Sequence, residues 1–241
     1  MRGCLFVVIV GALVLGVGAW LLAPGIAATI VAGSLRASGF SAETQTLAVA
    51  ADPPVRLLTG KADRLTLDAT GVTWGALTAS RLVFELDDVD LINRTAVNVD
   101  GRFNGVAVDA GPGTAATTAT ATITFDGPAD AAFTTIEVDR ASVRALVTAA
   151  VSRSFSTQLT DIELIAPDRL RLVAPGASLE GTLTVSGSNQ LSLSTRLGTV
   201  PLVTIDPSLP LDLQSVSADP TVLRIAGVLD VGRLLQGAGS S

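Results

Sequence analysis

The chain lacks histidine and tyrosine and has one cysteine, Cys4, and one lysine, Lys61. These absences exclude a Ser-His-Asp triad, a Cys-His pair, a histidine-ligated metal site and a cysteine cluster. A single cysteine also excludes an internal disulfide, so the fold must be held by its core. Only carboxylates, hydroxyls and arginines remain for chemistry. We therefore expect a protein that is not an enzyme and that uses no cofactor and no metal.

Charge is also scarce. Charged residues make up 16% of the 241 residues, against about 25% in a typical soluble domain. The net charge is −6 and the isoelectric point about 4.6, so the chain has no basic field to hold nucleic acid. Because apolar residues reach 48%, the composition indicates a membrane segment or an unusually apolar interior.

An apolar run at the N-terminus accounts for part of this hydropathy. It extends from Leu5 to Ala23 and ends at Pro24, and about 19 helical residues span about 28 Å, close to the core of a bilayer. We predict a signal anchor over residues 1–24 and a single domain over residues 25–241. No basic residue lies between Arg2 and Arg36, which predicts a single-pass cell-membrane protein with its domain on the extracytoplasmic side. Cleavage of a signal peptide near residues 27–28 is the alternative.

The rest of the chain alternates between apolar and polar residues, as strands do. Leu65 and Leu67 alternate with polar residues over residues 62–69, and Leu82, Phe84 and Leu86 do so over residues 80–91. We expect a hairpin turn over residues 70–75 between these two strands. Further strands are expected around residues 97–99, 106–108, 119–125, 162–165, 170–173, 179–185, 191–197, 200–205 and 222–228.

One segment has helical periodicity. From Asp139, a predicted N-cap, apolar residues recur at helical spacing as far as Phe155. A helix among antiparallel strands predicts an α+β fold in which the sheet covers the helix. The Gly/Pro/Thr/Ala-rich stretch after Gly111 is expected to be a loop within this one domain.

The apolar faces of these elements have two interpretations. They form either an ordinary solid core or the wall of a cavity for an apolar ligand, because aliphatic walls suit acyl chains. The predicted lipid-binding residues are Leu65, Leu67, Leu82, Phe84, Leu86, Ile123, Phe125, Val143, Leu146, Val147, Ala150, Val151, Leu170, Leu172, Leu183, Val185, Leu191 and Leu193.

A resemblance favours the second interpretation. Residues 54–67 (PVRLLTGKADRLTL), followed by Gly71-Val72, by residues 82–86 (LVFEL) and by residues 209–213 (LPLDL), resemble the bacterial LmeA-like phospholipid-binding family. The resemblance implies a tubular lipid-binding (TULIP-like) fold, with a strongly bent antiparallel sheet wrapped around a long amphipathic helix and an acyl chain held between them. It also implies binding of phospholipids in support of envelope glycolipid assembly.

We therefore expect a membrane-anchored, extracytoplasmic protein that encloses phospholipid acyl chains for transfer or presentation in envelope lipid biogenesis. Its expected partners are a phospholipid or related acyl lipid and the membrane, and not nucleic acid. A scaffold with a solid core is the first alternative. The second is a glycan enzyme that uses the carboxylates of Asp87, Asp88 and Asp90.

Three other features have a functional and a structural interpretation. Arg140 and Arg144, one helical turn apart, could hold a lipid phosphate or simply form a solvated helix face. The acidic residues 87–90 could bind Ca²⁺ or form a solvated strand end. Trp74 could dip into a membrane or anchor the core.

Overall fold

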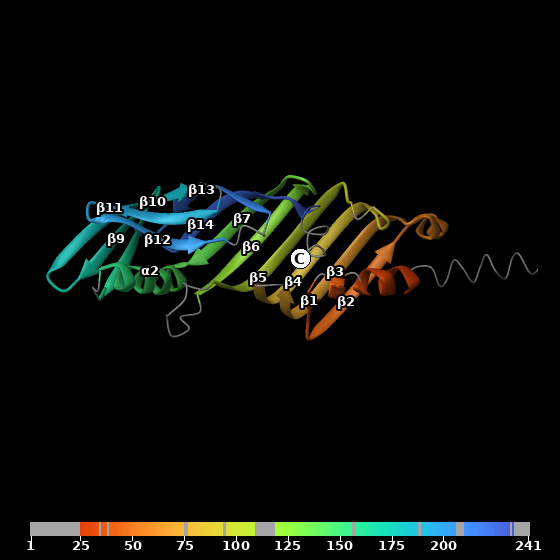
Figure 1. The fold of residues 1–241 in the computed structure, drawn as a ribbon, viewed down its shortest axis with the longest axis horizontal. Coiled ribbons are helices and arrows are strands. Elements are labelled where there is room, and N and C mark those ends of the chain that lie inside the picture. Colours follow the sequence, from red (N-terminus) through yellow and green to blue (C-terminus); the bar gives the residue numbers. More distant parts are fainter. Residues whose placement is uncertain are drawn as a thin grey trace, which may run out of the picture.

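The chain folds into two antiparallel sheets that lie next to each other along the long axis of the molecule (Figure 1). This computed structural model describes residues 25–33, 35–37, 39–74, 77–93, 95–108, 119–155, 158–187, 189–205, 210–231 and 233. All strand pairs in both sheets are antiparallel, which lets each sheet turn one face to solvent and the other to the core.

The larger sheet has nine strands in the order β1-β3-β4-β5-β6-β7-β14-β13, with β2 also paired to β3. Its strands β3 and β4 have 14 residues each. The bounds are β1 Phe40–Ser41, β2 Thr44–Ala50, β3 Lys61–Trp74, β4 Leu77–Asp90, β5 Asn98–Val108, β6 Ala119–Pro128, β7 Ala132–Asp139, β13 Leu211–Ala218 and β14 Val222–Leu229.

The smaller sheet has five strands in the order β12-β11-β10-β9-β8. Each is paired with its neighbour in sequence, so the sheet is a simple meander. The bounds are β8 Asp161–Ile165, β9 Arg169–Ala174, β10 Ala177–Ser186, β11 Gln190–Thr195 and β12 Gly198–Thr204.

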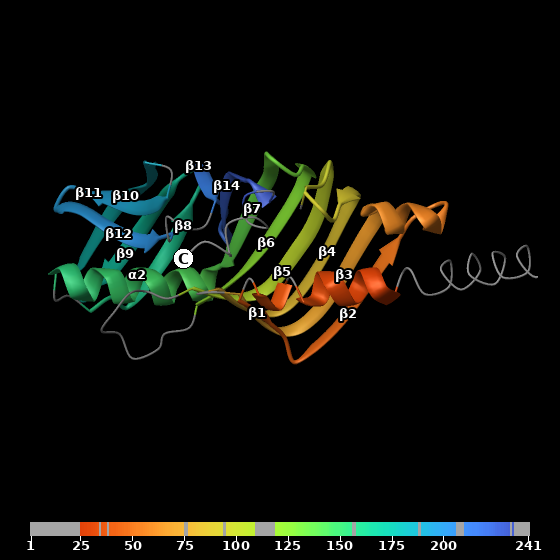
Figure 2. The same cartoon turned by 45° about the vertical axis from the view of Figure 1, so that its right-hand side comes forward.

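Helices are few among the described residues. Residues 25–33 and 35–37 are helical, η1 is the 3₁₀ helix Pro54–Thr59, and α2 is Arg140–Phe155. The predicted N-cap of α2 is confirmed, because the Asp139 carboxylate accepts a 2.9 Å hydrogen bond from the Ser142 N–H. Figure 2 shows α2 beside the five-stranded sheet and the N-terminal helix in front of β3.

The predicted fold class is wrong in its central feature. The sheet does not wrap around one long amphipathic helix, since α2 has 16 residues and packs at one end of the molecule, against β6, β7, β8, β12 and β14. A 16-residue helix is about 24 Å long, whereas the eight-strand path of the larger sheet is about 34 Å across at about 4.8 Å per strand. The helix is therefore too short to cover both sheets, and the part of the chain that the structure describes is mostly β-sheet.

The predicted membrane anchor, residues 1–24, lies outside the described residues. Within the residues that the structure does describe, no helix is long and apolar enough to cross a membrane. The longest described helix, α2, falls short of the about 20 residues that a span needs and carries Arg140, Arg144 and Arg153. This finding overturns two predictions: the N-terminal transmembrane helix that was part of the predicted fold class, and the single-pass location in the cell membrane.

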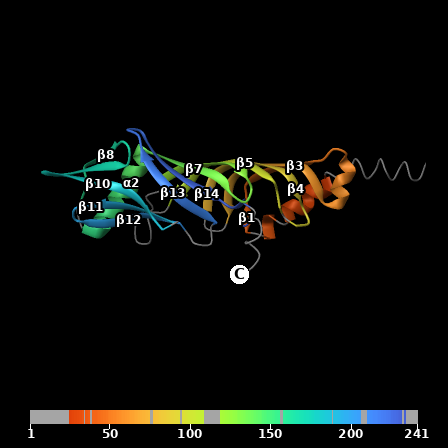
Figure 3. The same cartoon turned by 90° about the horizontal axis from the view of Figure 1, so that it is seen from above.

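The two faces of the sheets differ sharply in chemistry. On the solvent face, arginines bridge acids on neighbouring strands: Arg64 contacts Glu85 at 2.9 Å and Arg171 contacts Glu163 at 2.9 Å and Glu180 at 3.0 Å. The opposite face is aliphatic. Seen from above, the N-terminal helix runs along one side of the larger sheet (Figure 3), and its Ala27 and Leu35 are buried in the same core as the strands.

Candidate lipid-binding interior

The inner face of β3 and β4 carries five of the predicted lipid-binding residues. Leu65 pairs in register with Leu86, and Leu67 pairs with Phe84. These four side chains and Leu82 are all buried, while the residues between them face solvent or are only partly covered. The alternation in the sequence therefore identified the inner face of this hairpin correctly.

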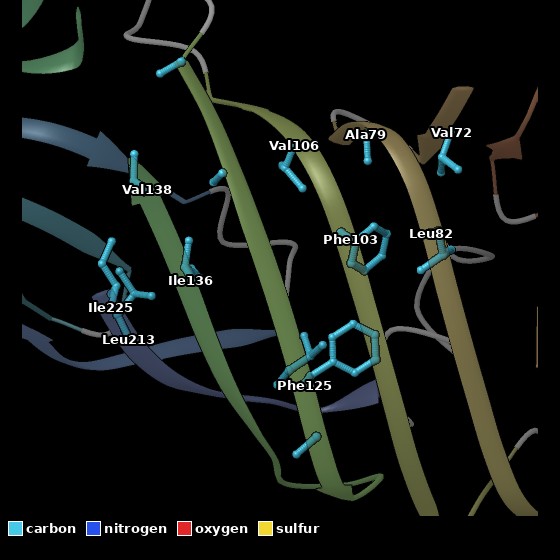
Figure 4. Close-up of a cluster of buried hydrophobic side chains, with 14 of the residues drawn as sticks. Val72, Ala79, Leu82, Phe103, Val106, Phe125, Ile136, Val138, Leu213 and Ile225 are labelled. Carbon is cyan, nitrogen blue, oxygen red and sulfur yellow. The ribbon is translucent and has the colours of Figure 1, made fainter. Parts of the chain in front are cut away.

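Three phenylalanines meet at the centre of the larger sheet. Phe125 lies with its ring centroid 5.9 Å from that of Phe84 and 5.8 Å from that of Phe103, and Figure 4 shows Phe103 and Phe125 on one face of the sheet. Gly101 is the register partner of both Phe84 and Phe125. A Cβ atom added at Gly101 would lie 2.3 Å from Cζ of Phe125, so the ring rests directly on the glycine backbone.

The second half of the interior lies between α2 and the five-stranded sheet. The inner face of α2 is buried from Ser142 to Val151, because these side chains recur at helical spacing on the side turned to the strands. The predicted residues here are Val143, Leu146, Val147, Ala150 and Val151 on the helix, and Leu170, Leu172, Leu183, Val185, Leu191 and Leu193 on β9, β10 and β11.

The structure joins both halves into one apolar cluster. All the predicted lipid-binding residues belong to it, and only Ile123 and Val185 are partly rather than fully buried. Among the described residues, four polar side chains are buried, namely Asp90, Thr134, Ser142 and Ser192, and none has a buried polar atom without a hydrogen-bond partner. The interior is thus aliphatic and aromatic, and its buried side-chain polar groups are already satisfied.

Several interior residues escaped the sequence prediction. β7 was missed because its first residues reverse the usual pattern: Thr134 points inward and is fully buried, whereas Phe133 points outward and is 56% exposed. Phe103 was missed because Gly101 and Gly105 interrupt the apolar pattern of β5. A signal that could have identified β7 is the alternation of Ile136 and Val138 with Glu137, directly after the turn that joins β7 to its partner β6.

Arg140 and Arg144, the predicted headgroup residues, lie on the outer face of α2 and reach β8. Arg140 Nη2 donates a 2.9 Å hydrogen bond to the Ile162 carbonyl, and Arg144 Nη2 donates to the Thr160 carbonyl. Both guanidinium groups also lie within 3.6 Å of the Asp161 carboxylate. A lipid phosphate would have to compete with these contacts, and the headgroup role stays a prediction.

The acidic residues at the end of β4 have structural partners. The Asp90 carboxylate accepts hydrogen bonds from Lys61 Nζ at 2.5 Å, from the Ile92 N–H at 3.0 Å and from the Asn93 N–H at 2.9 Å. The hydrogen bond from Lys61, followed by those from Asn93, holds the pKa of Asp90 well below its ordinary value. Asp87 contacts Arg64 at 3.3 Å. Among the described residues no group of three or more metal-ligating side chains is found.

Trp74 ends β3 and belongs to the core periphery. Its indole packs edge-on against Phe40, with ring centroids 5.7 Å apart, and it is only partly exposed. The turn predicted over residues 70–75 begins too early, since β3 continues to Trp74. Gly71 adopts a left-handed φ of 58° inside the strand, where the Glu43 side chain covers it.

Comparison with known proteins identifies no relative of this chain. No family model matches the chain, and no curated protein and no solved structure matches it.

Proposed function

We propose that this protein binds the acyl chain of a phospholipid or related lipid against the apolar inner faces of its two sheets. One observation carries the proposal: the apolar cluster is continuous from the nine-stranded sheet through α2 to the five-stranded sheet. An acyl chain needs surface and no hydrogen bonds, and this interior supplies such surface with its buried side-chain polar atoms already paired among the described residues.

The free energy of such binding would come from burial. At about 0.8 kcal/mol per methylene, ten buried methylenes contribute about 8 kcal/mol before the cost of ordering the chain is subtracted. No chemical step is required. The lipid would be held for transfer or for presentation to another protein.

The resemblance to the LmeA-like family supports the same proposal. The residues that carry the resemblance form η1, the first half of β3, the middle of β4 and the start of β13. Several of them, including Leu65, Leu67 and Leu213, are buried on the inner face of the larger sheet. The resemblance thus concerns the surface that would contact the lipid.

Native mass spectrometry of the full-length protein, released from detergent micelles after incubation with phosphatidylcholine, tests the proposal. We expect a species heavier than the bare chain by one or two lipid masses, and we expect it to survive collisional activation that strips detergent. If only the bare chain is seen at a large excess of lipid, the interior is a solid core and the proposal is wrong.

A further inference from the structure

Two arginines of one helix share a single carboxylate on the neighbouring strand. α2 packs against β8 (Figure 2), and Arg140 and Arg144 of α2 both reach Asp161 at the start of β8. Arg140 Nη2 lies 3.5 Å from Oδ2 of Asp161, and Arg144 Nη1 lies 3.6 Å from its Oδ1. All three side chains are about half exposed, so a ligand can reach them from solvent.

Both distances are long for contacts between these groups. A guanidinium normally donates to a carboxylate oxygen at about 2.7–2.9 Å. Asp161 is held by its own strand, because its Oδ1 accepts a 2.9 Å hydrogen bond from the Ile162 N–H. The two arginines are held by the carbonyl groups of Ile162 and Thr160. The carboxylate therefore gives the two positive charges only a loose partner.

A phosphate group would suit the two arginines better than this carboxylate does. Its oxygens can each face a different guanidinium, and it is not tied to the backbone of β8. Arginine is well matched to phosphate because its planar fork can donate two hydrogen bonds at once. A guanidinium has five N–H donors, so Arg140 and Arg144 can keep their hydrogen bonds to the carbonyl groups while a phosphate binds.

The place between these arginines borders the apolar interior. Val143 and Val147 on α2, and Ile162 and Leu164 on β8, are buried in the apolar cluster. A lipid whose phosphate lay between Arg140 and Arg144 would therefore have its acyl chains next to an apolar surface where α2 meets β8.

Two other acids nearby have partners of their own. The Asp139 carboxylate accepts hydrogen bonds from the N–H and the hydroxyl of Ser142, both at 2.9 Å. Glu163, two residues after Asp161, pairs with Arg171 at 2.9 Å. Among the described residues, Asp161 is thus the acid that meets both arginines.

We propose that Arg140 and Arg144 bind the phosphate of a phospholipid and that Asp161 competes with this phosphate for the same place. The inference rests on the proposed function, and it adds the class of headgroup and a residue that weakens its binding. A lipid without a phosphate gains nothing from the arginines and is not opposed by Asp161.

Calorimetric titration of the full-length protein with two short-chain lipids, each below its micelle concentration, tests the proposal. The lipids are a phosphatidylglycerol and the diacylglycerol with the same acyl chains. Asp161→Asn should lower the dissociation constant of phosphatidylglycerol about tenfold, as expected when a like charge about 4 Å away is removed. The dissociation constant of diacylglycerol should not change. Because the asparagine oxygen can still accept the Ile162 N–H, the strand should keep its structure.

Two further variants sharpen the test. Arg140→Gln/Arg144→Gln should raise the dissociation constant of phosphatidylglycerol about tenfold and leave that of diacylglycerol unchanged, which also shows that the interior is intact. The matched control is Glu163→Gln, which removes one negative charge from the same strand and should have little effect. If it tightens binding as much as Asp161→Asn does, the effect comes from net charge and the inference is wrong.

The outcomes separate this inference from the proposed function. If Asp161→Asn changes neither dissociation constant, or changes both equally, the inference is wrong while the proposed function stands, since lipid still binds. If neither lipid binds to any variant, both proposals are wrong. Glycerol phosphate, which has no acyl chains, should bind far more weakly than phosphatidylglycerol. Equal affinity would mean that the arginines hold a free phosphate ester, and it would overturn the inference.

Discussion

Asp90 shows how a residue suggested by sequence for catalysis or metal binding can serve a structural purpose. Its carboxylate joins Lys61 at the start of β3 to the turn that follows β4. An acidic run gives no information about its partners, because those partners come from another strand and from backbone N–H groups. The sequence left a solvated strand end, metal binding and catalysis open for this cluster, and it did not show that Asp90 is buried.

The lowered pKa of Asp90 makes a pH-dependent contribution to stability. Because the folded value lies below the unfolded value of about 3.9, the contribution is fully present above about pH 4 and is lost as the pH falls through the folded pKa. We expect Asp90→Asn to lower the free energy of unfolding at neutral pH and to flatten its decline in acid. Urea unfolding at about pH 6 and about pH 3 measures both effects.

Asp88→Asn is the matched control for that experiment. Asp88 is exposed on the same strand and has a φ of 50°, a conformation that asparagine tolerates. The control should retain the acid-induced loss of stability of the original chain. If both variants behave alike, Asp90 does not carry the effect.

Gly101 is required by the ring that covers it. An alanine at this position would collide with the ring of Phe125, which also packs against Phe84 and Phe103, and we expect Gly101→Ala to lower the free energy of unfolding by about 1–3 kcal/mol. In a Phe125→Leu background the same substitution should cost less, since the ring is gone. Equal costs in the two backgrounds, measured by urea unfolding, would show that the ring is not the obstacle.

At the scale of elements, local periodicity predicted those whose apolar residues recur regularly along the chain. The β3–β4 hairpin followed from period-2 alternation, and α2 followed from helical spacing after Asp139. The sequence did not predict that the helix is short relative to the sheet, because the part of a sheet that a helix can cover depends on how many strands join that sheet. Five strands form a separate sheet, and no periodicity marks where one sheet ends and the next begins.

The inner face of α2 offers a test of how tightly the interior is filled. Ala150 is 1% exposed, and a tryptophan there would occupy the space between the helix and the strands. If lipid binds in this region, Ala150→Trp should abolish lipid adducts in native mass spectrometry while lowering the free energy of unfolding by no more than about 1 kcal/mol. A solid core would instead be overpacked at a cost of about 1–3 kcal/mol or more.

Ala141→Trp is the control on the same helix. Ala141 is exposed in the first turn of α2, so the added indole can remain in solvent. Lipid adducts and stability should both be close to those of the original chain. Loss of adducts in this control would assign the effect of Ala150→Trp to the helix as a whole.

At the scale of the molecule, the apolar cluster crosses from one sheet to the other. The two sheets also share hydrogen bonds, such as that from the Ala218 N–H at the end of β13 to the Pro167 carbonyl in the turn before β9, at 2.6 Å. The sequence suggested a single domain for residues 25–241. It could not show that α2 and β13 connect the two halves, because their contacts join segments that are far apart in the chain.

We expect the two sheets to unfold in one cooperative transition, since neither can lose its inner face without exposing the other. In a Trp20→Phe variant, Trp74 is the sole tryptophan and reports on the nine-stranded sheet, whereas far-ultraviolet circular dichroism reports on both sheets. The two urea curves should coincide. An early change in circular dichroism alone would mean that the five-stranded sheet unfolds separately.

The contacts of Arg140 and Arg144 also bear on aggregation. β8 is the last strand of its sheet, and edge strands of this kind recruit strands from other chains into aggregates. Because both arginines occupy carbonyl groups at β8, those of Ile162 and Thr160, an incoming strand would have to displace two charged donors. At this edge the protein is thereby protected against the growth of intermolecular sheet when it is crowded.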